Sequence, residues 1–149
     1  EIRLSLVGSE MCIRDSIHPS HIEKILSGEK RYEYRKRIPT DIRYIVVYAT
    51  APIKMIVALI KIDSILKGTP ESVWEKTKKH AGVSKDFFML YFTDHQDSYA
   101  IKFKAVFKLE TPKSLMCLDN NVSAPQSYTY LKETAEELCN KLGIKRFEI

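Results

Sequence analysis

A run of charged side chains at residues 28–37 holds the residue types in this sequence that could do chemistry. If the run is a strand, alternate residues form one ionic face, made of Arg31, Glu33, Arg35 and Arg37. Charge-assisted hydrogen bonds from arginine would keep the Glu33 carboxylate ionised and in place. The carboxylate could then accept a proton from a base edge or a sugar hydroxyl, while arginine could bind phosphate or stack on a base.

Two purely structural interpretations of the same run stay open. The first is a solvated edge strand whose charges discourage aggregation. The second is an ion-pair network that fixes the preceding helix to the sheet. That helix is predicted to begin at Pro19, where the missing N–H suits a first helical position, and to end at Gly28, a helix-stopping residue. Lys30 would then lie at the junction of helix and strand, at the mouth of any cleft there.

The order of motifs along the chain gives a second line of inference. Ser16-Ile17-His18-Pro19, then Ile22 and Ile25-Leu26, then Gly28-x-Lys30-x-x-Glu33-x-Arg35, resembles the opening of the ASCH domain, a family of the PUA-like superfamily. The resemblance covers roughly residues 16–131. It implies an α+β fold, a PUA-like mixed β-barrel of about five strands with flanking helices. Family members are proposed to bind RNA, and some are described as hydrolases.

The resemblance also implies a site. In the ASCH family the lysine, glutamate and arginine that match Lys30, Glu33 and Arg35 look toward a cleft between barrel and helix. Gln126 and Ser127 resemble a family segment that returns toward that cleft. The expected ligand-binding residues are therefore Lys30, Glu33, Arg35, Arg37, Gln126 and Ser127.

Two function classes follow from the resemblance. The favoured one is an RNA- or nucleotide-binding domain, which could be regulatory, with no cofactor and no metal. The alternative is a small amidohydrolase acting on N-acetylated cytidine or another modified nucleoside, in which Lys30 would be catalytic. In such enzymes a threonine stands three residues after the lysine and a glutamate lies downstream. Here Glu33 takes the place of the threonine, and no glutamate matches near Ala81.

The first residues of the chain resemble a cloning or sequencing artefact more than native protein sequence. Residues 6–15 resemble an in-frame translation of a transposon-based sequencing adapter, so we expect residues 1–15 not to be native and the natural N-terminus to lie upstream of Ser16. Residues 16–149 are then one domain that ends in an amphipathic helix at about 127–142. Met11 to Ile17 could still occupy the position of the missing first strand, because its alternate residues are apolar.

Composition limits the remaining possibilities. Without residues 1–15 the chain keeps 22 basic and 16 acidic residues, a net charge of +6 in place of +5, which is compatible with an anionic partner. Cys117 and Cys139 are widely spaced and make neither a disulfide framework nor a zinc pattern. No apolar run is long enough to span a bilayer. We expect a cytoplasmic protein, and the sequence leaves its oligomeric state open.

Two further segments bear on the core. Residues 98–109 alternate between apolar and polar side chains, so Tyr99, Ile101, Phe103 and Phe107 are expected to face the interior of the barrel. The aromatic cluster at residues 87–92 is expected mainly to cover the core rather than to stack on bases, because helical aromatic clusters usually serve packing.

Overall fold

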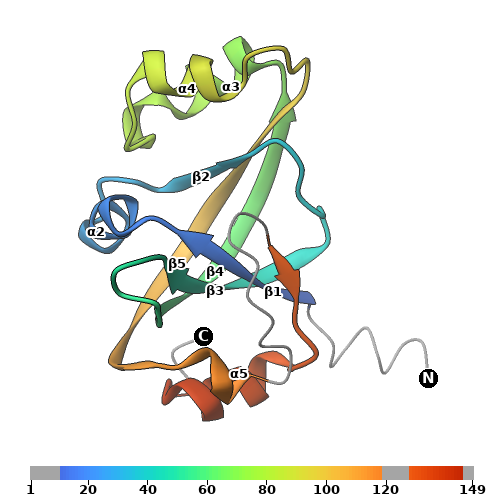
Figure 1. Cartoon of the computed structure of the whole chain (residues 1–149). Coiled ribbons are helices and arrows are strands. Elements are labelled where there is room, and N and C mark those ends of the chain that lie inside the picture. Colours follow the sequence, from blue (N-terminus) through green and yellow to red (C-terminus); the bar gives the residue numbers. More distant parts are fainter. Residues whose placement is uncertain (1–10, 119–127, 146–149) are drawn as a thin grey trace, which may run out of the picture.

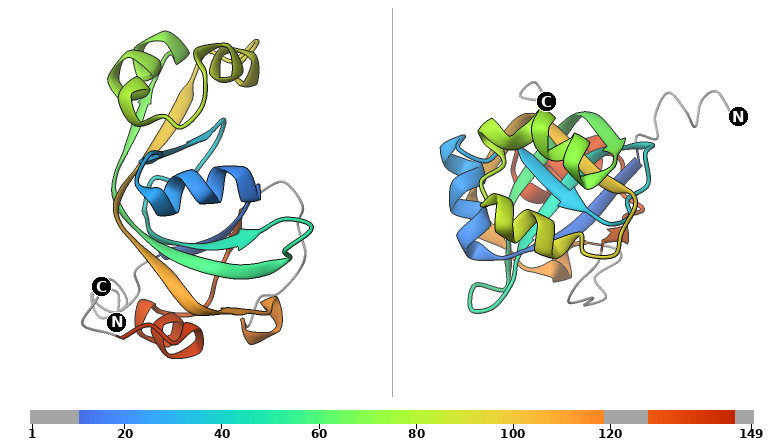
Figure 2. Two further views of the ribbon diagram at one scale, coloured as in Figure 1. Left: turned by 90° about the vertical axis from the view of Figure 1, so that its left-hand side faces the viewer. Right: turned by 90° about the horizontal axis from the view of Figure 1, so that it is seen from above.

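The computed structural model describes residues 11–118 and 128–145. In this part of the chain six strands form one curled sheet, with the order β2-β5-β4-β3-β1-β6 (Figures 1 and 2). The strands are β1 (Met11–Ile17), β2 (Tyr32–Arg35), β3 (Ile42–Ala49), β4 (Met55–Gly68), β5 (Ser98–Lys113) and β6 (Thr129–Tyr130). β1 runs parallel to β3 and the other pairs are antiparallel, so the sheet is mixed.

Four α-helices accompany the sheet among the described residues: α2 (Pro19–Ser27), α3 (Pro70–Thr77), α4 (Lys85–Tyr91) and α5 (Ala135–Leu142). Helices α3 and α4 cover one end of the long β4–β5 ribbon, and α5 lies at the opposite end (Figure 1). The predicted α+β, mixed architecture is confirmed, with six strands where about five were expected. No helix in the described ranges is long and apolar enough to cross a membrane.

Local sequence chemistry sets the ends of the helices. Helix α2 ends at Gly28, which adopts a left-handed conformation with φ of 86°, and α3 and α4 begin at the capping side chains of Thr69 and Ser84. Helix α5 begins at Ala135 and not near residue 127 as predicted. The reason is a reciprocal capping box between Thr134 and Glu137, while Thr129 and Tyr130 pair with β1 instead.

The core divides into three apolar clusters. One joins α5 to the sheet around Leu138, and a second joins α2 to β1, β3 and β4 around Ile45. The third joins α3 and α4 to β2 around Phe88. Strand β2 therefore lies against helix α4 on the side of Tyr34, whose ring packs on Phe88.

The β5 register agrees in part with the expected alternation. Ile101 is fully buried, while Tyr99 and Phe103 are half-buried against the second cluster and Phe107 against the first. The strand continues to Lys113, beyond the expected end at residue 109, because its pairing with β4 extends to Ile56 through several register shifts.

Strand β1 is an interior strand of the sheet, between β3 and the short edge strand β6. Cys12, Ile13 and Ile17 are buried in it, and its parallel register pairs Ile13 with Ile45. The described part of the adapter-like segment, residues 11–15, thus belongs to a core strand in this structure. Its native or foreign origin stays a prediction.

Candidate functional site

The charged run forms a short strand with a buried face. β2 pairs antiparallel with β5, with Glu33 opposite Ile101 and Arg35 opposite Tyr99. Because side chains alternate along a strand, Glu33 and Arg35 point to the same side. Lys30 precedes the strand in a connection fixed by backbone hydrogen bonds, from the Lys30 N–H to the Lys24 carbonyl and from the Arg31 N–H to the His80 carbonyl.

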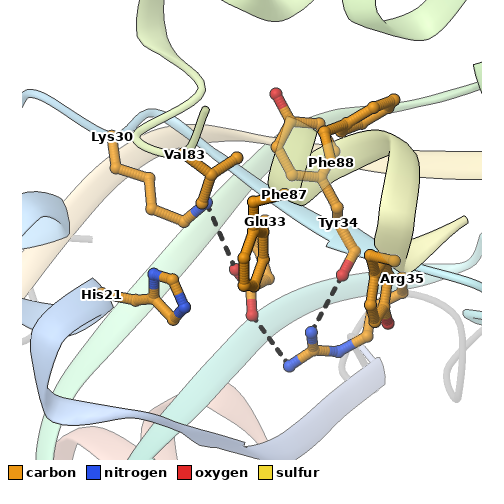
Figure 3. A pocket seen from close by; sticks show the side chains of 9 residues that line it. His21, Lys30, Glu33, Tyr34, Arg35, Val83, Phe87 and Phe88 are labelled. Carbon is orange, nitrogen blue, oxygen red and sulfur yellow. Dashed lines mark hydrogen bonds and ion pairs between the residues drawn. The ribbon is translucent and has the colours of Figure 1, made fainter. Parts of the chain in front are cut away.

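An ion-pair network joins these side chains. Glu33 lies between two cations (Figure 3): its Oε1 is 3.7 Å from Lys30 Nζ, and its Oε2 is 2.8 Å from Arg35 Nη2. The same Nη2 of Arg35 lies 2.6 Å from Asp15 Oδ2, and Arg35 Nη1 donates to the carbonyl of Tyr34 at 2.9 Å. The arginine thus holds two carboxylates from different strands.

A cavity of about 110 Å³ opens beside this network. Its lining combines the charged groups with aromatic rings from α4, and consists of His21, Lys30, Glu33, Tyr34, Arg35, Val83, Phe87, Phe88 and Tyr91. Helix α2 supplies His21, β2 and the connection before it supply the charged groups and the ring of Tyr34, and α4 supplies the other rings (Figure 3). The space is large enough for several water molecules or a small planar group.

Lys30 is held by the loop that precedes α4. Its Nζ donates to the carbonyl of Ala81 at 2.8 Å and lies 4.9 Å above the ring of Tyr34. The side chain is only 2% exposed, so Lys30 forms part of the cavity wall and does not stand free at a cleft mouth as expected. Burial lowers the pKa of Lys30 below its ordinary 10.5, an effect that the charge of Glu33 partly offsets.

The pKa values of the two carboxyl groups around Arg35 are shifted in opposite directions from their ordinary values. Burial raises the pKa of Asp15, and the charge of Arg35 offsets this only in part. Burial alone would also raise the pKa of Glu33, but Arg35 and Lys30 outweigh it and hold that pKa below 4.5. Glu33 is therefore the ionised acceptor of the site.

The structure brings together three of the six expected ligand-binding residues: Lys30, Glu33 and Arg35. Arg37 lies beyond the end of β2, is exposed and does not line the cavity, because the strand stops at Arg35 and the alternation on which its placement depended stops with it. Arg31 is also exposed, and its Nε donates to the carbonyl of Gly28. Gln126 and Ser127 lie outside the described residues.

Sequence reasoning missed two polar residues of the site. Asp15 lies in the segment set aside as an adapter, and its pairing with Arg35 spans 20 residues. His21 was not among the expected site residues, whereas its neighbour His18 caps α2 with an Nδ1 that accepts from the Ser20 N–H. His21 itself lines the cavity, with a buried Nδ1 that has no hydrogen-bond partner among the described residues, and burial lowers its pKa.

This arrangement can accept hydrogen bonds at one ionised carboxylate and contact a flat ring with aromatic side chains. Two of its polar side chains already have partners, since Glu33 is paired with Arg35 and Lys30 donates to the carbonyl of Ala81. Within residues 11–118 and 128–145, no group of three or more His, Cys, Asp or Glu side chains is placed to hold a metal ion.

Comparison with known proteins gives relatives under 30% identity. No family model matches the sequence. A protein of Zymomonas mobilis named an ASCH domain-containing ribonuclease is 27% identical over 128 residues, which are 83% of this chain and 86% of that protein. Large ribosomal subunit protein uL22 of Ureaplasma parvum is 29% identical over 105 residues, 70% of this chain but 33% of that protein.

Solved structures agree with the sequence relatives. The crystal structure of ASCH from Zymomonas mobilis matches with a TM-score of 0.77 and 27% identity, over 89% of this chain and 93% of that one. A serine-to-alanine variant of that protein matches with a TM-score of 0.78 and 24% identity, over 91% and 97%. The resemblance to the ASCH domain that the motifs predicted is confirmed, and so is the α+β fold of that type.

Proposed function

We propose, since this chain is an ASCH-type domain, that it binds RNA or a nucleotide-like ligand at the cavity beside Lys30, Glu33 and Arg35. The observation that carries the proposal is the position of Glu33. Its carboxylate is buried and ionised between two cations on the wall of a cavity lined with aromatic rings. A buried ionised acceptor beside flat rings suits a heterocycle that carries N–H donors on its edge.

Two further facts favour a nucleic acid among possible ligands. The Zymomonas mobilis relative is named a ribonuclease and the Ureaplasma parvum relative a ribosomal protein. The chain itself is basic, with a net charge of +5, and β5 exposes Lys102, Lys104 and Lys108. These lysines are ordinary solvated groups unless a phosphate backbone follows them, in which case affinity falls with salt.

The ion-pair network also braces the fold, so binding has to be measured separately from stability. Thermal melting with nucleosides and short RNAs does this, because a ligand of the native state raises Tm relative to the same protein without ligand. We expect Tm of the wild type to rise with ligand concentration. Glu33→Gln and Lys30→Met should lower the ligand-free Tm and also abolish most of the ligand-induced rise.

The matched control is Lys132→Met, which removes one positive charge from an exposed position. The ligand-induced rise in Tm should be nearly the same as in the wild type, because this variant loses only one charge at a distance from the cavity. A set of nucleosides and RNAs that leaves Tm of the wild type unchanged would reject the proposal. So would a ligand-induced rise that survives in both cavity variants, because the network would then be only a brace.

Hydrolysis is the second candidate function. It is favoured by the name of the Zymomonas mobilis relative and by the buried Lys30, whose lowered pKa makes the neutral amine more accessible. Two assays separate it from binding alone: cleavage of a short RNA, and release of acetate from N-acetylated cytidine. Turnover by the wild type that Lys30→Met abolishes, while binding persists, would establish the enzyme.

A further inference from the structure

The aromatic cluster of α4 is split between core and solvent. Phe88 and Phe92 are 1% and 2% exposed and cover the core as the sequence predicted. Phe87, in the first turn of the same helix, is 51% exposed. It also lines the cavity beside Glu33 and Lys30, whereas the still more exposed Leu90 does not. A single exposed apolar residue is ordinary, but this ring stands at a charged cavity.

The backbone under Phe87 is fixed on two sides. The hydroxyl of Ser84 accepts the Phe87 N–H at 3.1 Å and caps the helix. The neighbouring Phe88 packs against Tyr34 and Trp74, with ring centroids 4.8 Å and 5.1 Å away. Phe87 is therefore presented from a rigid support, and little ordering would be needed when a ligand contacts it.

The ring of Phe87 is also oriented by its one aromatic contact in the described structure. His21 meets it edge to face, with centroids 5.9 Å apart and an interplanar angle of 61°. His21 and Phe87 come from α2 and α4, the two helices on either side of the cavity. The charged acceptor Glu33 and this ring therefore belong to one cavity wall and rim (Figure 3).

We propose that Phe87 is a stacking platform for an unpaired nucleobase whose edge reaches Glu33. The inference rests on the proposed function and specifies its ligand as single-stranded RNA. A base stacks through its face and is recognised through its edge, and both are accessible only when the base is outside a duplex. A duplex of the same sequence keeps its base faces covered and cannot occupy the platform.

Fluorescence titration of a short RNA that carries 2-aminopurine tests the platform in the full chain. Stacking on the ring should quench the probe, and Phe87→Ala and Phe87→Leu should each weaken affinity roughly 5- to 100-fold. Phe87→Trp keeps an aromatic face and should retain binding. The matched control is Leu90→Ala, on the same helix and outside the cavity, which should change affinity less than about twofold.

Three outcomes would overturn the platform. Affinity unchanged in Phe87→Ala but lost in Glu33→Gln would leave the proposed function standing and remove only Phe87 from it. Duplex RNA bound as tightly as the single strand would contradict the requirement for an unpaired base. Self-association of the wild type that both Phe87→Ala and Leu90→Ala abolish would identify a protein interface instead. Failure of the wild type to bind any RNA would reject the proposed function itself.

Discussion

Gly82 lies against the aliphatic stem of Lys30 so closely that a Cβ added at Gly82 would be 2.5 Å from Lys30 Cβ and 2.6 Å from its Cγ. The peptide there also holds two lysines by their ammonium groups. The carbonyl of Ala81 accepts from Lys30 at 2.8 Å, and that of Gly82 accepts from Lys24 at 3.0 Å. This loop thereby fixes both the stem and the head of Lys30 and ties helix α2 to the cavity wall.

We expect Gly82→Ala to destabilise the fold and to displace Lys30. Alanine would have to adopt the left-handed backbone that Gly82 already has, with φ of 71°, which costs about 1–2 kcal/mol, and its Cβ adds a contact that Lys30 must relieve. Gly28→Ala is the matched control, because Gly28 has φ of 86° but nothing within 4 Å of the added Cβ. Urea unfolding should show a larger loss for Gly82→Ala. Equal losses of unfolding free energy in the two variants would show that the Lys30 side chain can move away from the added Cβ at no cost.

Removing Arg35 should be among the most damaging single changes. Arg35→Met leaves Glu33 and Asp15 buried side by side without their shared cation, and breaking a buried pair in this way costs about 3–5 kcal/mol. The added change Glu33→Gln should recover part of that loss, which a double-mutant cycle measures. As a control, Lys78→Met breaks an exposed pair with Glu75 and should hardly change stability. A mild effect of Arg35→Met would mean that water already reaches the carboxylates.

The pH dependence of stability should carry a contribution from His21. Burial lowers its pKa from 6.5, so the folded protein holds this proton less tightly than the unfolded chain. Its contribution to stability is therefore complete above about pH 7 and is lost as pH falls below 6.5. The charged or titratable groups that act on it are Glu33, Lys30, His18 and Lys24.

The difference in Tm between wild type and His21→Gln isolates this contribution, because the other groups titrate in both proteins. As pH falls from about 7.5 to about 5.5, the wild type should lose stability relative to the variant. A difference that stays constant with pH, or that changes in the opposite direction, would contradict a neutral, half-buried His21.

Strand β1 should prove to be part of the folding unit, whatever the origin of its sequence. Ile13 is fully buried in it, and Ile13→Ala should destabilise the protein by about 2–5 kcal/mol. Chemical denaturation measures the loss, and Arg43→Ala, at an exposed position on the neighbouring strand, serves as the control. If Ile13→Ala is as mild as that control, the strand adds little to the core.

Helix ends have local causes in the sequence, and such features could be predicted best. The end of α2 at Gly28 follows from a single capping residue and was predicted. The start of α5 was missed although its signal is local, a threonine at 134 followed three residues later by glutamate. The predicted start at Ser127 gave weight to an amphipathic stripe instead of that capping box.

The cavity depended on contacts between distant segments and could be predicted only in part. Lys30, Glu33 and Arg35 were found because they fall in one motif. Asp15 was lost with the N-terminal segment, and the alternation of charges gave Arg37 a place that the short strand does not provide. Phe87 shares its helix and residue type with the buried Phe88, so only the packing of α4 on β2 separates the two.

The network around Arg35 has one further consequence, which concerns how a ligand would arrive. Two cations, Lys30 and Arg35, face two carboxyl groups, Glu33 and Asp15, so with all four ionised their charges cancel. Such a group exerts little force beyond about a Debye length, roughly 8–10 Å. Encounter with an anionic ligand is then governed by lysines spread over the surface, and the cavity governs how long the ligand stays. Surface charge changes should alter the association rate, and cavity changes the dissociation rate.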